Sequence, residues 1–499
     1  MHGRFASLGA ALRWRSWSVH AQRLFPEKGV EADFTSTLAF RTSPYQSEIR
    51  KVMKQDRESA RGGAAHEQQP QQPQQQQEQQ RKLKLSSPLT SIPQQVFSAG
   101  QWLEHLDLSG TGLSSLPPDF SAQLPHLKIL FLSSCHFSVF PSELQSCAQL
   151  EMIAFRGNRM QRIPENAFPP RLRWLILTDN DISELPASIG RCERLEKCLL
   201  AGNKLRSLPA EMQRCHNLAL LRLSANALDA IPEWLFAMPR LSFLSYAGNP
   251  CTLTPSATES NNLPSVNWAD LEVHSILGQG ASGVISAATW HSRSVAVKRF
   301  RAAVTSDGAP RDEMAAVVAG GRHENIIDVL GCVADESNKD SAGALVMQLI
   351  PEDYRVLGLS PSFESCSRDC FAPETRLLSA AGLAILRGVA GAAAHLAGKG
   401  IAHGDLYAHN VLYNDSGHAF LGDFGAATVH GSTDGRHEKL ELLAFAHLIQ
   451  DVMGLMPEAD AGLVQRLETL HAECSDADVK LRPRLGEVVA RLQTIDAQG

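Results

Sequence analysis

The sequence predicts a multidomain chain in which a solenoid of short repeats, an α/β horseshoe arc, precedes an α+β domain. Three observations support this. A leucine-rich pattern ends in asparagines spaced 22 or 23 residues apart, a glycine-rich loop precedes a lysine-bearing strand, and a polar motif with two aspartates follows. The chain has 499 residues, too many for one core, and its 43% apolar and 20% charged content is ordinary for globular domains.

Before the repeats, the chain lacks the pattern of a folded domain. The first acidic residue is Glu27, and the preceding segment is rich in arginine and serine, a bias that matches an organelle transit peptide; the alternative is a disordered basic tail. Residues 59–84 contain the run QQPQQQQEQQ, which cannot bury enough apolar surface to offset the entropy of ordering. We therefore predict that residues 1–82 form a disordered tail with a glutamine-rich linker.

The repeat reads Leu-x-x-Leu-x-Leu-x-x-Asn, followed by Leu-Pro, and resembles a leucine-rich repeat solenoid of about seven turns. Residues 83–252 are assigned to it. Because buried backbone groups must be paired, we expect each asparagine amide to bond the backbone of a bend. The five clearest copies end at Asn158, Asn180, Asn203, Asn226 and Asn249, and two earlier copies start at Leu103 and Leu127.

The concave strands of such a solenoid carry its exposed, functional side chains. Their charge varies from turn to turn, so the sequence identifies no ligand, and a merely solvated face is the alternative for each. We expect a protein substrate or regulator to bind this concave face. The expected exposed residues are Glu104, Asp107, Lys128, Arg173, Lys197 and Arg222.

A stretch rich in proline, serine and threonine follows Asn249 and predicts a linker at residues 253–266, before a second domain at residues 267–495. The run LGQGASGVI then has GxGxxG spacing, which alone also fits dinucleotide-binding turns. Here a strand ending in VAVK, at Lys298, follows shortly after. That order of glycine loop, strand and lysine is typical of protein kinases.

The segment Ile401–Thr428 places two carboxylates and a carboxamide at the spacing of a magnesium-dependent phosphoryl-transfer site: Asp405, Asn410 and Asp423, which opens a DFG turn. With the glycine loop and VAVK, it resembles a protein kinase. The resemblance implies a bilobal α+β domain that binds ATP and Mg²⁺. It assigns the catalytic base to Asp405, the metal ligands to Asn410 and Asp423, and phosphate neutralisation to Lys298.

Further site residues follow from the same resemblance. Glu313, with Asp312 as its rival, is the expected partner of Lys298. Residues 344–347 are predicted to form a buried strand, with Met347 as gatekeeper, and residues 348–350 form the predicted adenine-contacting hinge. The predicted nucleotide-binding residues are Gly278, Gln279, Gly280, Ala281, Ser282, Gly283, Ile285, Ala296, Lys298, Met347, Gln348 and Ile350.

Three departures from the kinase pattern concern the catalytic loop. Gly404 replaces an arginine that usually receives an activation-loop phosphate, so we expect activity without phosphorylation there. Tyr407 stands where serine/threonine kinases usually have a phosphate-binding lysine, and His409 where tyrosine kinases often have arginine. The loop therefore leaves the class of acceptor open.

The activation segment is expected to be short, because Glu441 opens what resembles the helix that anchors the large lobe, and no APE motif precedes it. Arg482 resembles a late arginine that pairs with the APE glutamate, and Glu438 is its expected partner here. So short a segment leaves little surface near the cleft to select a protein substrate.

HGDLYAHN, VAVKRF, the TSDG segment and the solenoid together are similar to leucine-rich-repeat protein kinases without membrane anchors. We expect an intracellular, cytoplasmic protein kinase, with serine/threonine specificity favoured; organelle targeting is the alternative location. A pseudokinase scaffold and a small-molecule kinase are the alternative functions.

Bulk composition narrows the partners further. The net charge of −6 gives no global basic field for nucleic acid, and ten cysteines without CxxC pairs indicate reduced thiols. The apolar stretch Leu377–Gly398 is interrupted by Arg387 and His395, which favours a buried helix over a membrane span.

Overall fold

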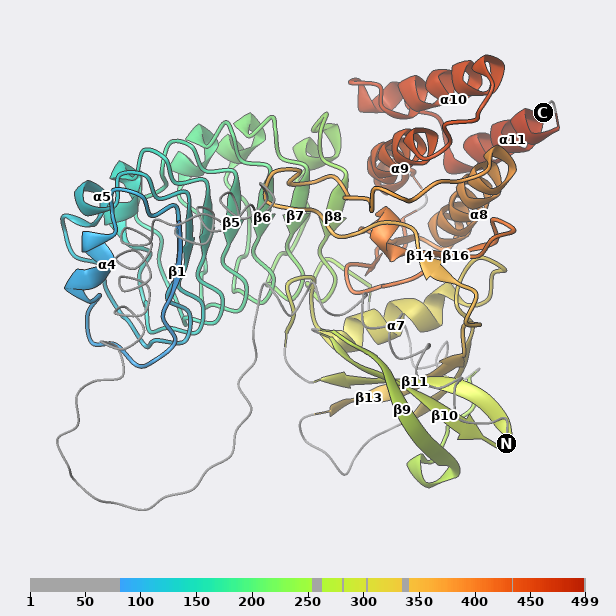
Figure 1. The fold of residues 1–499 in the computed structure, drawn as a ribbon, viewed down its shortest axis with the longest axis horizontal. Coiled ribbons are helices and arrows are strands. Elements are labelled where there is room, and N and C mark those ends of the chain that lie inside the picture. The colour runs from blue at the N-terminus through green and yellow to red at the C-terminus, as the bar shows by residue number, and fades with distance from the viewer. Residues whose placement is uncertain are drawn as a thin grey trace, which may run out of the picture.

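The computed structural model describes residues 81–253, 263–280, 282–301, 304–333, 341–432 and 434–497. Nearly all of the predicted N-terminal tail, most of the predicted linker, and Ala281 of the predicted nucleotide site lie outside the described residues. Figure 1 shows an arc of repeats beside a second unit built of two lobes, as predicted.

Eight parallel strands, paired in chain order, form the solenoid sheet. The seven copies predicted from the sequence correspond to β2–β8, and β1 precedes the first of them. The strands are β1 (Lys82–Lys84), β2 (His105–Asp107), β3 (Ile129–Phe131), β4 (Met152–Ala154), β5 (Trp174–Ile176), β6 (Lys197–Leu199), β7 (Leu220–Arg222) and β8 (Phe243–Ser245).

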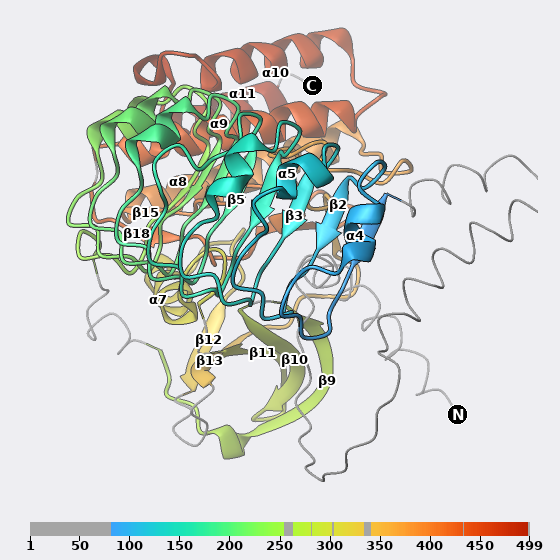
Figure 2. The ribbon, with the colours of Figure 1, turned by 90° about the vertical axis from the view of Figure 1, so that its left-hand side faces the viewer.

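Short helices line the other side of the arc, as Figure 2 shows end-on. In four repeats a proline that follows Leu, Phe or Ile lies immediately before a 3₁₀ helix, where its fixed φ suits helix entry. The helices are α4 (Gln94–Ser98), α5 (Phe120–Gln123), η1 (Ser142–Ser146), η2 (Ala187–Arg191), η3 (Ala210–Arg214) and η4 (Glu233–Ala237).

The asparagines form the predicted buried ladder. Asn180 donates from Nδ2 to the carbonyls of Phe155 and Leu177, both at 2.9 Å, and its Oδ1 accepts from the backbone N–H of Asn158 at 3.1 Å. Equivalent bonds recur at Asn203, Asn226 and Asn249. Each amide thus pairs backbone groups that the tight bends leave without partners, which confirms the structural role predicted for them.

The small lobe is a five-stranded antiparallel sheet in the order β12-β13-β11-β10-β9, with helix α7 packed beside it. Val266 lies in the apolar core of this sheet, so the predicted linker ends earlier than residue 266. The elements are η5 (Trp268–Asp270), β9 (Leu271–Gln279), β10 (Gly283–Trp290), β11 (Arg293–Arg301), α7 (Pro310–Gly320), β12 (Val329–Val333) and β13 (Ser341–Gln348).

The large lobe is mainly helical. Helix α8 is long and apolar enough to cross a membrane by length and composition alone, yet it packs inside the lobe as predicted, with Leu386 and Val389 fully buried. The elements are β14 (Arg355–Val356), α8 (Ser379–Gly398), β15 (Ile401–Ala402), η6 (Ala408–Asn410), β16 (Val411–Tyr413), β17 (Ala419–Leu421), β18 (Thr428–Val429), α9 (Arg436–Gly454), α10 (Ala461–Cys474), η7 (Val479–Leu481) and α11 (Leu485–Asp496).

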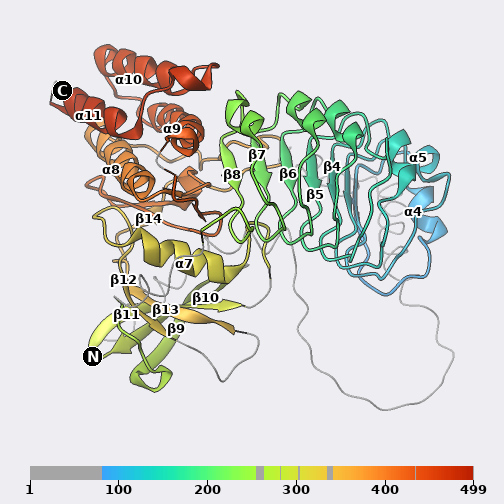
Figure 3. The ribbon, with the colours of Figure 1, turned by 180° about the vertical axis from the view of Figure 1, so that it is seen from behind.

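The last repeats of the solenoid pack directly against the second unit, and Figure 3 shows β7 and β8 beside it. Leu220 and Phe243 belong to the apolar core of the large lobe, while Leu440 of α9 belongs to that of the solenoid. This contact corrects one prediction: Lys197 and Arg222, expected to be exposed, are buried. The two units therefore share hydrophobic cores.

The cysteines agree with the predicted reduced state. All ten lie among the described residues, and each is a free thiol. Burial raises the pKa of Cys147, Cys192 and Cys474 to about 12, so these three are unreactive thiols of the apolar interior.

Candidate active site

The glycine loop joins β9 to β10 at the mouth of the small lobe. Gly280 donates its N–H to the carbonyl of Gly283 at 2.9 Å, which closes the turn. A Cβ at Gly283 would lie 2.1 Å from the carbonyl oxygen of Arg299, whereas a Cβ at Gly280 would meet nothing within 4 Å. Gly283 is thus required by strand packing, and Gly280 leaves open space of the kind a phosphate needs.

Lys298, on β11, forms a buried ion pair with Glu313 of α7. Burial alone would lower the pKa of Lys298, but the charges of Glu313 and Asp423 outweigh it and raise the pKa, so the ammonium stays charged. The rival Asp312 lies at the edge of this arrangement, where its nearest ion-pair partner is Arg311 at 3.7 Å. The structure therefore brings together the predicted pair, Lys298 and Glu313.

An apolar group lies next to the glycine loop. It consists of Leu277, Ile285 and Ala296, with Leu349 packed against them. Sequence reasoning named Ile285 and Ala296 but left out Leu277 and Leu349. These four side chains offer the flat apolar surface that an adenine ring requires.

The other predicted hinge residues point elsewhere. Met347 packs on the cluster that contains Phe300, Ile350 packs with Leu412 and Phe420, and Gln348 lines a separate cavity with Tyr354. Their side chains are thus outside the apolar group beside the glycine loop. A hinge can contact adenine through its backbone, so Met347 as gatekeeper and residues 348–350 as hinge stay predictions.

Asp405 and Asn410 meet in the catalytic loop. Asn410 donates from Nδ2 to Asp405 Oδ2 at 2.8 Å and to the Asp405 carbonyl at 2.9 Å. His403, which the prediction did not name, is fully buried; its Nε2 bonds the Gly422 carbonyl at 3.0 Å, and its Nδ1 accepts from the Asp405 N–H at 3.3 Å. His403 therefore ties the catalytic loop to the DFG turn.

Asp423 projects an exposed carboxylate from the DFG turn, with φ of +51°. Its Oδ1 accepts from the Gly425 N–H at 3.1 Å. Because the Asn410 amide turns its nitrogen to Asp405, its oxygen is left as a ligand. One amide oxygen and one carboxylate fit Mg²⁺, which takes oxygen ligands and binds few protein groups beside substrate phosphates. Within the described ranges, no cluster of three or more acidic, histidine or cysteine side chains forms a metal site.

The two unusual loop residues have partners of their own. Tyr407 stacks on Phe243 of the solenoid, with ring centroids 3.9 Å apart and planes at 9°. His409 Nδ1 lies 2.6 Å from Asp369 Oδ1. Burial would lower the pKa of His409, but the bond and charge of Asp369 outweigh it and raise the pKa. His409 therefore pairs with Asp369, and the ring of Tyr407 packs on the solenoid.

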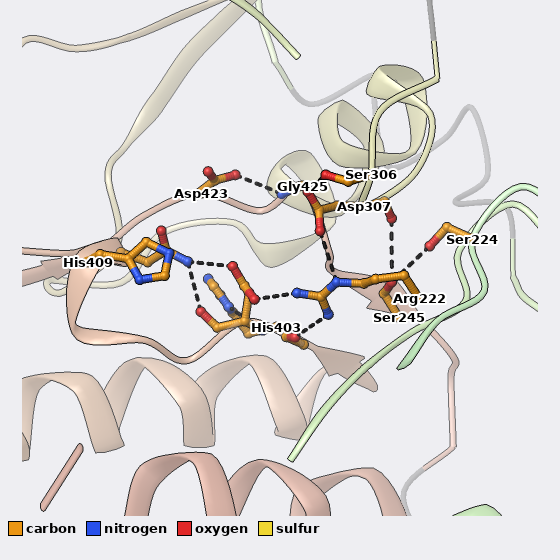
Figure 4. Close-up of polar contacts among 12 residues, drawn as sticks. Arg222, Ser224, Ser245, Ser306, Asp307, His403, His409, Asp423 and Gly425 are labelled. Atoms are coloured by element: carbon orange, nitrogen blue, oxygen red, sulfur yellow. Dashed lines mark hydrogen bonds and ion pairs between the residues drawn. The ribbon is translucent and has the colours of Figure 1, made fainter. Parts of the chain in front are cut away.

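Arg222 of β7 reaches into the catalytic loop, which sequence reasoning did not anticipate. Its guanidinium, 2% exposed, donates to Asp405 Oδ1, to the Gly404 carbonyl at 2.8 Å and to Asp307 Oδ1 at 2.9 Å. Figure 4 shows Arg222 directed at Asp307 of the TSDG segment. Burial would raise the pKa of Asp405, but the charges of Arg222, His409 and His403 and the Asn410 hydrogen bond together outweigh it and hold the pKa below its ordinary value.

Gly404 lies where the loop touches the solenoid. Its φ is +73°, and a Cβ there would lie 2.7 Å from the Ala426 carbonyl oxygen and 2.9 Å from that of Leu244 on β8. Its N–H donates to Glu441 at 2.8 Å. The arginine expected from the kinase pattern could not fit, because any side chain would collide with the adjoining backbone.

Two predictions about the activation segment are corrected. Helix α9 begins at Arg436, before Glu441, so the segment is even shorter than expected, and Glu441 is a buried helix residue. Glu438 pairs with Arg484 at 2.8 Å rather than with Arg482. Arg482 instead donates to the carbonyls of Asp476, Lys439 and Pro239, the last belonging to the solenoid.

Comparison with known proteins bears on both units. Residues 271–443 match the family model of protein tyrosine and serine/threonine kinase, and residues 81–137 match that of leucine rich repeat. The chain is 25% identical over 175 residues to "Serine/threonine-protein kinase TNNI3K" of Mus musculus, covering 33% of this chain and 19% of that protein.

Two further relatives cover different parts. "Serine/threonine-protein kinase mos" of Gallus gallus is 25% identical over 170 residues, 33% of this chain and 49% of that protein. "Receptor-like protein 39" of Arabidopsis thaliana is 35% identical over 105 residues, 20% of this chain and 12% of that protein. The chain thus spans less than half the length of each of these relatives.

Proposed function

We propose that this chain is an ATP- and Mg²⁺-dependent serine/threonine protein kinase whose repeats bind a protein substrate or regulator. The proposal starts from the matches to a protein kinase domain and to leucine-rich repeats. The serine/threonine class is supported by the names of two relatives, both serine/threonine-protein kinases. Each is 25% identical over a third of this chain.

The observation that carries the proposal is the convergence of separate segments on one cleft. Lys298 pairs with Glu313, and Asp405 is bonded to Asn410 beside the DFG turn that carries Asp423. These groups come from β11, α7, the catalytic loop and the turn after β17. Phosphoryl transfer requires such positioning and charge neutralisation more than covalent chemistry.

Each group has a defined task. The open space at Gly280 admits phosphates, the charged Lys298 neutralises them, and the apolar group of Leu277, Ile285, Ala296 and Leu349 receives the adenine. Asp405 accepts the hydroxyl proton of the acceptor. Asn410 and Asp423 would hold Mg²⁺, which neutralises charge on the transferring phosphate when bound.

A phosphotransfer assay tests the proposal. Full-length protein is incubated with ATP labelled at the γ-phosphate, Mg²⁺ and a degenerate peptide library, and products are sorted by acceptor residue. We expect label on serine or threonine, and Asp423→Ala should reduce turnover by about a hundredfold or more with the melting temperature unchanged. Label only on tyrosine would refute the specificity, and no transfer despite ATP binding would support a pseudokinase scaffold.

The small-molecule alternative is favoured by one specific observation. Phe243 covers Tyr407, and Thr428 of the activation segment accepts a bond from the Tyr246 N–H of the solenoid at 3.1 Å. Much of the surface on which a kinase aligns a peptide is therefore in contact with the chain itself. Phosphate transfer to a small hydroxyl compound, with no transfer to any peptide of the library, would support this alternative.

A further inference from the structure

The catalytic loop has no arginine or lysine at the positions where kinases usually place one. Gly404, Tyr407 and His409 occupy those positions, and the ring of Tyr407 is used in stacking on Phe243. His409 is directed to Asp369. A site that transfers a phosphate needs positive charge fixed near the base, so the deficit in this loop calls for another source.

The solenoid supplies a cation at this place. Arg222 is 2% exposed, and its fork-shaped guanidinium donates hydrogen bonds to three acceptors, Asp405, Asp307 and the Gly404 carbonyl. Arginine suits such a site because its donors are fixed in one plane and its charge does not titrate.

Other contacts hold Arg222 in this position. Ser306 Oγ donates to Asp307 Oδ2 at 2.9 Å, and Ser245 Oγ on β8 donates to the Asp307 carbonyl at 3.4 Å. Figure 4 shows Ser224, Ser245 and Ser306 grouped around Asp307 and Arg222. A Cβ at Gly308 would lie 2.8 Å from Cβ of Ser224, so the TSDG segment is seated closely on the solenoid.

Gly404 also lies at this contact between the solenoid and the catalytic loop. A side chain at residue 404 would collide with the Leu244 carbonyl of β8, and the space that an arginine would need is taken by the solenoid. The missing loop arginine and the inserted solenoid arginine are thus explained by one docking contact.

We infer that Arg222 is a positioning residue of the phosphotransfer site, so that the site is complete only when the solenoid is docked on the kinase domain. The inference rests on the proposed function. Arg222 holds Asp405 Oδ1, and Asn410 holds Oδ2, which fixes the plane of the carboxylate. Each carboxylate oxygen has two lone pairs, so one on each stays available to the acceptor hydroxyl.

This arrangement makes the activity of the kinase domain depend on its contact with the repeats. A kinase domain with a self-sufficient cleft would keep its activity toward a generic peptide when the repeats no longer contact it. With Arg222 in the site, disruption of the contact lowers turnover toward every acceptor, whether or not the repeats also bind a partner.

The test uses full-length variants. Arg222→Gln removes the charge, Arg222→Lys keeps the charge without the fork, and Arg156→Gln is the matched control. Arg156 also links the solenoid to this segment, donating to the Val304 carbonyl at 3.1 Å, but it makes no contact with Asp405. For each variant, kcat, KM for ATP, nucleotide affinity and melting temperature are measured.

We expect Arg222→Gln to lower kcat by roughly tenfold to a hundredfold with KM for ATP within about twofold, the pattern of an interaction made at the reacting centre. Arg222→Lys should recover part of the loss, and Arg156→Gln should keep kcat within about twofold of the parent. If Arg222→Gln does not fold, Asp307→Asn, which loosens Arg222 from its anchor, should show a smaller loss of the same kind.

Other outcomes overturn the inference in distinguishable ways. A normal kcat in folded Arg222→Gln would leave the proposed function intact and remove Arg222 from the site. A raised kcat, or activity in Arg222→Gln alone while the parent is inactive, would make Arg222 an inhibitory contact. No transfer by parent or variants, with ATP bound, would refute the proposed function and the inference with it.

Discussion

Replacing Phe243 with alanine tests whether solenoid and kinase domain form one packed unit. Phe243 is 1% exposed, lies in the core of the large lobe and stacks on Tyr407 at 3.9 Å. Phenylalanine-to-alanine changes in cores cost about 3–5 kcal/mol because apolar contact is lost and a cavity remains. We expect Phe243→Ala to cost that much and to loosen the catalytic loop in the same step.

Phe137→Ala is the matched control. Phe137 is also 1% exposed and also contacts an aromatic ring, that of Phe155, edge-on at 5.1 Å, but it lies wholly inside the solenoid core. It should cost similar stability without reaching the catalytic loop.

The assay pairs urea denaturation with amide hydrogen exchange of residues 406–410. Only Phe243→Ala should accelerate exchange in that loop beyond what the global loss of stability explains. A loss of stability below about 1 kcal/mol in Phe243→Ala, or equal loop exchange in the two variants, would refute the shared core. Removal of a ring from a packed core destabilises a protein by more than that.

Two further predictions concern Gly404 in the catalytic loop and Glu441, which accepts the Gly404 N–H. Burial raises the pKa of Glu441 from 4.5 to about 7, so the folded state keeps a proton that the unfolded state loses, and stability falls by about 3 kcal/mol as pH rises from 4.5 through 7. Glu441→Gln should match the parent near pH 4.5 and exceed it at pH 8 by about that amount in urea denaturation; a difference independent of pH would contradict this. Gly404→Ala should cost about 1–3 kcal/mol in the same measurement, because its Cβ meets two carbonyl oxygens at a φ of +73°. Gly398→Ala, whose Cβ meets nothing within 4 Å, is the control and should be neutral or slightly stabilising; equal costs at the two glycines would rule out the collision.

Periodic features were predictable from sequence because local chemistry determines them. The leucine spacing gave the repeat strands, the asparagines gave the buried ladder, and the order of glycine loop, VAVK strand and DFG turn gave the two lobes. The pairing of Lys298 with Glu313 also followed, since α7 presents Glu313 to β11 over a short sequence distance.

Long-range docking was not predictable, because nothing in the repeat pattern distinguishes Arg222 from an exposed concave arginine. Its partners Asp307 and Asp405 lie 85 and 183 residues away in the chain. Two local signals existed. Gly404 and Tyr407 both depart from the kinase pattern within one short loop, and in the structure both residues contact the solenoid.

The apolar group beside the glycine loop was predictable in part. Strand alternation fixes that neighbouring side chains face opposite ways, but not which of the two faces the cleft. The kinase pattern indicated Ile285 and Ala296, whereas nothing in it singled out the side chains of Leu277 and Leu349.

The most direct test of the account is the transfer of labelled γ-phosphate by the full-length chain and by Asp405→Asn at equal nucleotide occupancy. Asparagine keeps the size of the side chain and removes its ability to accept the hydroxyl proton. The account predicts transfer by the parent, a loss of about a hundredfold or more in Asp405→Asn, and unchanged affinity for ATP. Parental turnover in Asp405→Asn, with an unchanged melting temperature, would contradict it.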